Sequence, residues 1–183
     1  MKKLVGIFII AASIFTSSMQ AQECKNFHKK KCWGSDDPNM SYNSQSKSGM
    51  FVLGHTSDLV FVGHGGHDYR ISLCQDSDVE EPIKFKVLDS RSEEVLFDNE
   101  AAALDVPVAE EGAEGEEFLE NGGLPMYFEF TAEVTKKVIV RITAPGPPPE
   151  EGKRGKRDVA PDPESLFCVG VLIENMPTPK LGF

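Results

Sequence analysis

The sequence predicts an all-β protein, a single antiparallel β-sandwich of about eight strands in jelly-roll or Greek-key order. Short runs of β-branched and aromatic residues recur from residue 50 onward, and each run is bounded by Gly, Pro, Asp, Asn or Ser. Helical periodicity is nearly absent after Ala21. Several runs also alternate apolar and polar residues, as strands with one buried face do.

The expected strands cover residues 50–53, 59–62, 69–74, 83–89, 94–99, 126–132, 134–143 and 167–174. Alternation is clean where Ile83, Phe85 and Val87 share one face, which we expect to be buried. A short polar turn separates the fourth run from the fifth, which predicts a hairpin. The last run is apolar on both faces, and this pattern predicts a central strand.

A glycine pair, Gly65-Gly66, separates the second run from the third. It predicts a two-residue hairpin turn, because glycine adopts the positive φ that such turns need. That register would set His64 opposite His67 on one face. The buried face of the hairpin would then consist of Val60, Val62, Tyr69, Ile71 and Leu73.

His64 and His67 are therefore weak candidates for metal ligands. A metal site normally has three or four protein ligands, and Asp68 would point to the opposite face of the hairpin. His55 would lie about 30 Å from His64 along an extended strand. We expect neither a resident metal nor a cofactor.

The segment Met1–Ala21 has the form of a secretory signal peptide, with Lys2 and Lys3, an apolar run and then small and polar residues. We expect cleavage after Ala21 and a mature chain without a transmembrane segment. Cleavage would remove two of the 19 basic residues and leave all 29 acidic ones, so the formal charge would change from −10 to −12. Nucleic acid is a poor partner for so acidic a chain.

All four cysteines, Cys24, Cys32, Cys74 and Cys168, follow the signal sequence. An exported chain reaches an oxidising compartment, so two disulfides are expected. Three pairings are possible and sequence alone does not choose among them. Local closure favours Cys24 with Cys32, which leaves Cys74 for Cys168. A zinc site is disfavoured, because no C-x-x-C motif is present.

The predicted organisation is a signal peptide at 1–21, an N-terminal arm with the Cys24–Cys32 loop at 22–48, a sandwich domain at 49–175 and a tail at 176–183. Two insertions interrupt the sandwich, an acidic one near 100–123 and a proline-rich one near 144–165. Neither has enough apolar residues to offset the entropy of ordering the chain, so both are expected to be mobile loops.

Motifs for catalysis are missing from the sequence. There is no G-x-S-x-G, and no triad can be assembled from the residue pattern. The arm carries a short basic patch, whose weak candidates for partner contact are Lys29, Lys30, Lys31 and Trp33. Such a patch could contact an anionic surface, but we expect the more common case, a solvated arm pinned by the Cys24–Cys32 loop with Trp33 packed on the sandwich.

The segments HDYRISLC, IKFKVLDSRSEEVLFDN, MYFEFTAEVTKKVIVRI and CVGVLIE lie between Met50 and Glu174. In strand order and in the D-Y-R-I-x-L-C and L-F-D-N phrases, they resemble small exported β-sandwich proteins of Gram-negative bacteria similar to the pre-peptidase C-terminal domain (PPC-like). The long insertions and the N-terminal arm depart from that pattern. The resemblance implies an accessory module that binds carbohydrate or protein surfaces and has no catalytic residues.

These observations predict a non-catalytic, exported binding or accessory module in the periplasm or at the cell surface of a Gram-negative bacterium. Its partner would be an envelope protein assembly or a glycan. One alternative is a small hydrolase or metal-dependent enzyme with a site assembled from distant residues, and another is a structural subunit of an envelope complex. A concave pocket with convergent histidines and carboxylates would favour the enzyme, and a flat apolar or aromatic sheet face would favour binding.

Overall fold

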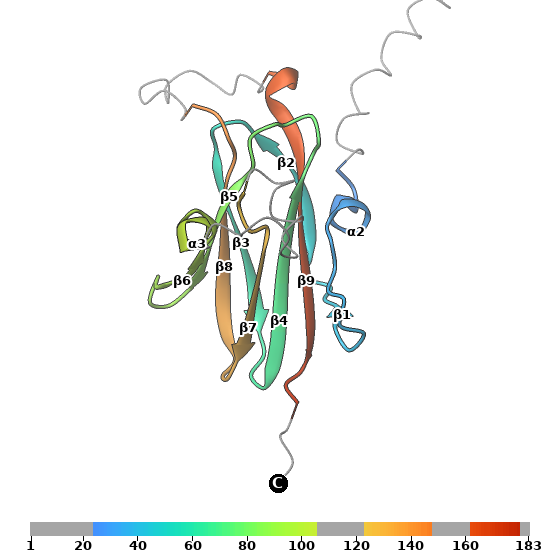
Figure 1. Ribbon diagram of the computed structural model, residues 1–183, viewed down its shortest axis with the longest axis vertical. Helices are drawn as coiled ribbons and strands as arrows, with labels where there is room; N and C mark the ends of the chain where they lie inside the picture. The colour runs from blue at the N-terminus through green and yellow to red at the C-terminus, as the bar shows by residue number, and fades with distance from the viewer. Residues whose placement is uncertain (1–23, 106–122, 148–161, 180–183) are drawn as a thin grey trace, which may run out of the picture.

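Two antiparallel β-sheets face one another and enclose one hydrophobic core (Figure 1). The computed structural model describes residues 24–105, 123–147 and 162–179. Within these ranges it has nine strands, all paired antiparallel. The predicted all-β sandwich is confirmed. The predicted signal peptide lies outside the described residues.

The five-stranded sheet consists of β1 (Ser41–Tyr42), β2 (Lys47–Val52), β4 (His67–Gln75), β7 (Tyr127–Ala132) and β9 (Leu166–Pro177). The four-stranded sheet consists of β3 (Thr56–Gly63), β5 (Lys84–Asp89), β6 (Val95–Asp98) and β8 (Lys136–Thr143). Three short helices complete the described elements: α2 (Phe27–Lys31), α3 (Asn99–Asp105) and the 3₁₀ turn η2 (Pro163–Ser165). No helix in these ranges is long and apolar enough to cross a membrane.

The strand order is that of a jelly roll. One sheet runs β2-β9-β4-β7, with β1 beside β2 on the same flank of β9, and the other runs β3-β8-β5-β6. From β2 to β9 the chain changes sheet at every connection except the β5–β6 hairpin, which the sequence predicted. The predicted central strand is also confirmed, because β9 pairs with β4 on one side and with β1 and β2 on the other.

The core forms where alternating strands turn their apolar faces inward. Ile83, Phe85 and Val87 are fully buried, as their alternation predicted. Tyr69, near the start of β4, joins the two sheets: its ring packs on Phe61 from β3 and stacks on Phe130 from β7. Aromatic contacts of this kind add to the free energy gained by burying the rings.

The predicted hairpin at the glycine pair is wrong. β3 pairs with β8 in one sheet, whereas β4 pairs with β7 and β9 in the other, so the chain crosses between sheets at residues 64–66. Of the predicted core face, the β4 residues Tyr69, Ile71 and Leu73 are buried. On β3 the opposite face points inward: Phe61 is buried and Val60 is 48% exposed. The run 59–62 is apolar on both faces, and the larger Phe61 ring gains more by burial.

The two glycines instead let this crossing pack against the turn between β7 and β8. A Cβ on Gly65 would lie 3.0 Å from the Glu133 carbonyl oxygen and 3.1 Å from the Thr135 backbone nitrogen. Gly66 has a φ of 75° and donates its backbone N–H to the Ala132 carbonyl at 2.7 Å. The glycine pair therefore holds two inter-sheet connections together.

Short helices lie at the start of the first expected insertion, α3, and at the end of the second, η2. Asn99 opens α3 and is fully buried; its Oδ1 accepts a hydrogen bond from Phe85 N–H and its Nδ2 donates one to the Ile83 carbonyl. Residues 106–122 and 148–161, which hold most of both insertions, lie outside the described residues. The helix at 99–105 was not expected from the sequence, because the two hydrogen bonds that anchor it join Asn99 to Ile83 and Phe85, which lie far from it in the sequence.

Replacing Gly65 with Ala is expected to destabilise the fold by about 1–3 kcal/mol, because the added methyl group meets backbone atoms that cannot rotate away. The free energy of unfolding in urea measures this loss. Gly49→Ala is the matched control, since its Cβ would lie 3.7 Å from the Phe51 ring, an ordinary contact. Equal stability of the two variants would contradict the close packing of the two connections.

Candidate binding groove on the five-stranded sheet

Two disulfides attach the N-terminal arm to the outer face of the five-stranded sheet. Cys24 is bonded to Cys168 on β9, and Cys32 is bonded to Cys74 on β4. The predicted pairing of Cys24 with Cys32, and of Cys74 with Cys168, is wrong. Helix α2 lies between Cys24 and Cys32 in the sequence, and the two cysteines bond to different strands. They therefore do not form a disulfide with each other.

Helix α2 lies close against β9 because the strand has a glycine beneath it (Figure 1). A Cβ on Gly170 would lie 2.8 Å from both the Cys74 Sγ and the His28 Cα, and 2.9 Å from the Cys32 Sγ. Any larger residue would therefore push the helix and one disulfide away from the sheet. Because the helix covers the outer face of β9, residues on both faces of this strand are buried, which agrees with its apolar sequence.

His28 fastens the same helix to the neighbouring strands. Its backbone N–H donates to the Ser48 hydroxyl oxygen at 2.8 Å, and its Nδ1 lies 2.6 Å from the same oxygen. Its Nε2 lies 3.3 Å from the Tyr42 hydroxyl. Burial lowers the pKa of the imidazole from its usual value of 6.5, and the adjacent Lys29 ammonium lowers it further. The contact between His28 and Ser48 therefore joins the helix to the sheet, and the second ring nitrogen of the histidine faces the Tyr42 phenol. This arrangement suits an anchor for the helix rather than an activated serine nucleophile.

The second disulfide positions Trp33 above β4. Because Cys32 is bonded to Cys74, the next residue along the arm is held at the edge of a groove that crosses the outer face of the sheet. The groove has a volume of about 580 Å³. The arm forms one wall, the start of β7 forms the other, and the 76–82 loop closes one end.

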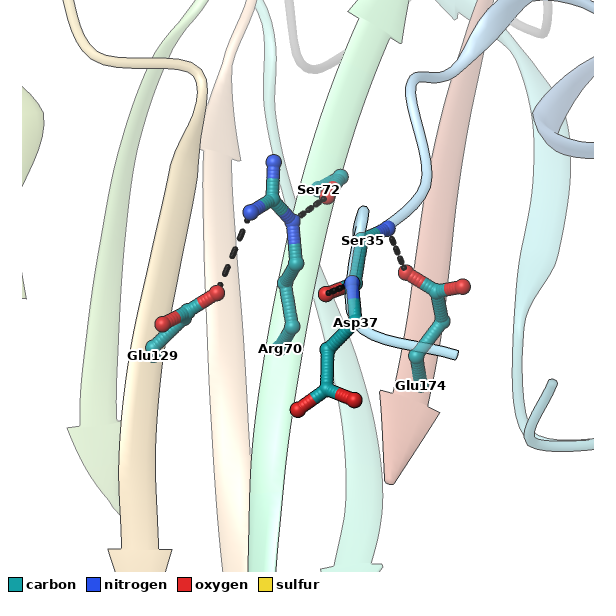
Figure 2. A network of polar contacts seen from close by, with 6 residues as sticks. All are labelled: Ser35, Asp37, Arg70, Ser72, Glu129 and Glu174. Carbon is teal, nitrogen blue, oxygen red and sulfur yellow. Dashed lines mark hydrogen bonds and ion pairs between the residues drawn. The ribbon is translucent and has the colours of Figure 1, made fainter. Parts of the chain in front are cut away.

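Arg70 forms part of the groove floor and is fixed by three side chains, two of which, Ser72 and Glu129, are drawn in Figure 2. Strand register places it between Glu129 on β7 and Glu174 on β9. Its Nε donates to the Ser72 hydroxyl at 3.2 Å, its Nη1 donates to Glu129 Oε1 at 3.1 Å, and its guanidinium lies 4.0 Å from the centre of the Tyr127 ring. A cation over an aromatic face is attracted by the ring quadrupole, so these contacts orient both side chains.

Glu174 holds the arm beyond Trp33. Its Oε2 accepts the backbone N–H of Ser35 at 2.7 Å (Figure 2). A Cβ on Gly34 would lie 3.1 Å from its Oε1. The Ser35 hydroxyl in turn accepts the backbone N–H of Asp37 at 3.1 Å. The segment that carries Trp33 is thus held by a covalent bond on one side and by a charge-assisted hydrogen bond on the other.

Despite these restraints, the Trp33 side chain is not packed: the residue is 71% exposed. The expectation that it packs on the sandwich is wrong. Across the groove Tyr127 is 42% exposed, so aromatic rings from two distant parts of the chain border the same hollow.

The predicted arm candidates have different locations. Lys31 and Trp33 line the groove, whereas the Lys29 ammonium lies over the Tyr42 ring at 4.1 Å and Lys30 is exposed. Arg70 and Tyr127 were not predicted. The alternation of apolar residues around Arg70 and Tyr127 indicated that both side chains point outward. Their proximity could not be predicted, because it depends on the pairing of β4 with β7, which are far apart in the sequence.

The histidines of the HGGH segment do not form the predicted pair on one face of a hairpin. The His64 backbone N–H donates to the Tyr69 hydroxyl at 2.8 Å, and His67 Nδ1 lies 3.3 Å from the Gly65 carbonyl oxygen. Among the residues that the structure describes, no group of three or more His, Cys, Asp or Glu side chains is arranged to hold a metal ion.

Removing the disulfide beneath Trp33, with Cys32→Ser and Cys74→Ser together, is expected to release the indole as well as to cost about 2–4 kcal/mol of stability. Trp33 is the single tryptophan of the chain, so its fluorescence anisotropy reports its motion directly. The control removes the other disulfide with Cys24→Ser and Cys168→Ser. Only the first variant should lower the anisotropy of Trp33; an equal effect in both would contradict its positioning by Cys32.

His28 predicts a specific loss of stability in mild acid. Because its pKa is lower in the folded than in the unfolded chain, unfolding takes up a proton as the pH falls. The contribution of His28 is complete above about pH 6.5 and is lost as the pH falls through the folded pKa. The thermal midpoint should therefore fall less between about pH 7.5 and about pH 5 in His28→Gln than in the parent. A His28→Gln variant with the parent's slope would contradict this contribution of His28.

Comparisons with known proteins leave the family of this chain open. No protein-family model matches it, and no curated protein matches it. Among solved structures, Aeromonas hydrophila PliG, a periplasmic lysozyme inhibitor of g-type lysozyme, is similar with a TM-score of 0.40 and 8% sequence identity; the match covers 79% of this chain and 92% of that chain. The jelly-roll assignment rests on the strand pairing of this chain, and the resemblance to the pre-peptidase C-terminal domain stays a prediction.

Proposed function

We propose that this chain is an exported, non-catalytic binding protein of the cell envelope, which engages a protein assembly or a glycan through the groove beside Trp33. One observation carries the proposal: the largest side chain of the molecule is firmly positioned by its backbone and yet 71% exposed. An aromatic ring that is exposed to solvent and attached to an ordered backbone is typical of binding sites.

The energetics favour this role. Covering an exposed indole contributes on the order of 3 kcal/mol, from its large apolar area. Because the arm is already held by the Cys32–Cys74 disulfide and by Glu174, little conformational entropy remains to be lost on binding. Trp, Tyr and Arg are also the residue types that dominate binding energy at interfaces, and Trp33, Tyr127 and Arg70 meet at this groove.

Export is supported by the cysteines and by the N-terminal sequence. All four cysteines form disulfides, which persist in oxidising compartments such as the periplasm. The segment Met1–Ala21 has the pattern of a signal peptide. Both features agree with a protein of the envelope, as does the predicted likeness to accessory domains of exported proteins.

The groove does not support the enzyme alternative. Its charged lining residues are Lys31, Arg70, Asp76 and Glu80, and no histidine is among its lining residues in the described part of the chain. Arg70 is engaged by Glu129 and Ser72. Ser72 and Ser77 also line the groove, but in the described part of the chain neither hydroxyl is hydrogen-bonded to a carboxylate or a histidine, and Ser72 accepts from Arg70. The arrangement therefore offers contact surface and hydrogen bonds rather than an activated nucleophile.

A fluorine label on Trp33 tests the proposal. Protein containing 5-fluorotryptophan gives one ¹⁹F resonance, because the chain has one tryptophan. We expect this resonance to shift or broaden when envelope fractions of the native host are added. Val60→Ala, an exposed apolar position on the other sheet, should leave the response unchanged. A resonance that no envelope fraction alters would overturn the proposal.

A further inference from the structure

We infer that the groove takes an uncharged oligosaccharide, an inference that rests on the proposed binding function and names the class of ligand. Three properties of the described residues support it: the size of the groove, the placing of its aromatic rings and the balance of its charges. Each restricts the ligand in a different way.

The size of the groove suits a few sugar rings. Its volume of about 580 Å³ lies within the range of small-molecule sites and is open along the face of the sheet. The floor consists of β4 side chains, and the sheet beneath them is fixed by pairing with β7 and β9. A rigid floor with open sides suits a short chain of rings better than a single enclosed small molecule.

The aromatic rings and the polar groups match the two kinds of surface on a sugar. A pyranose ring has faces of C–H groups and a rim of hydroxyls. The C–H faces are attracted to the electron-rich faces of aromatic rings, and the exposed rings of Trp33 and Tyr127 border the groove from the arm and from β7. The Arg70 guanidinium covers one face of Tyr127, so a sugar would stack on the other face. The hydroxyl rim needs both donors and acceptors, which Lys31 and Arg70, and Asp76 and Glu80, supply respectively.

The charges of the groove favour a neutral ligand. The lining contains two cations, Lys31 and Arg70, and two anions, Asp76 and Glu80. Arg70 is already neutralised by Glu129 at 3.1 Å, so the groove has no concentrated positive charge for an anionic ligand. An anionic ligand would lose hydration without gaining a matched partner, and a cationic ligand would meet Asp76 and Glu80 in a groove that Lys31 also lines. A neutral ligand avoids both costs.

The test compares trisaccharides that differ mainly in charge. The neutral probes are triacetylchitotriose, cellotriose and maltotriose, and the charged probes are the chitosan trimer, with three ammonium groups, and trigalacturonate, with three carboxylates. Binding is followed by the ¹⁹F resonance of labelled Trp33 and by calorimetry. We expect at least one neutral trisaccharide to bind, and the charged probes to bind about tenfold more weakly or not at all.

Variants of the two rings locate the bound sugar. Trp33→Ala, followed by calorimetry, and Tyr127→Ala should each weaken binding by about tenfold, since each removes one stacking surface. Tyr127→Phe, which retains the ring, should bind within about twofold of the parent. Thermal midpoints establish that each variant is folded, and Tyr127→Leu replaces Tyr127→Ala if the latter does not fold.

Each remaining outcome separates this inference from the proposed function. If all three neutral sugars leave the resonance unchanged while a protease-sensitive envelope component shifts it, the partner is a protein and only the glycan inference fails. Tighter binding of either charged probe also overturns the inference. If no envelope component of any kind alters the resonance, both fail.

Discussion

The attachment of the N-terminal arm to strands β4 and β9 is the constraint on which the candidate site depends. Two disulfides, Cys24–Cys168 and Cys32–Cys74, hold the arm across the outer face of a sheet. The contact is possible because Gly170 leaves room for a helix where a side chain would otherwise stand. Without this attachment Trp33 would have no defined position, and the groove would lose one of its walls.

The same attachment explains how a stable sandwich can keep an aromatic surface unpacked. The core obtains its stability from residues buried between the sheets, such as Tyr69 and Phe85, and does not need Trp33. The arm is held by covalent bonds and by Glu174 instead of by burial of its tryptophan. Its indole therefore remains free to contact a ligand at little cost in ordering.

At the HGGH segment the local sequence predicted a change of chain direction but not the strands that lie beside it. A glycine pair between two apolar runs indicated a turn, and a change of direction does occur there. Whether the chain turns within one sheet or crosses to the other depends on which strands lie beside β3 and β4. Those neighbours, β8 for β3 and β7 and β9 for β4, come much later in the chain. In the structure the glycines serve a close approach to the turn at residues 133–135.

The sequence by itself determined the fold class, the positions of most strands and the inward face wherever apolar and polar residues alternate, as at Ile83, Phe85 and Val87, because these depend on local periodicity. The tertiary structure decided the disulfide pairing, the inward face of β3 and the meeting of Trp33, Arg70 and Tyr127 at one groove. Each of these depends on contacts between residues far apart in the chain, whose partners are chosen by the packing of the whole sandwich.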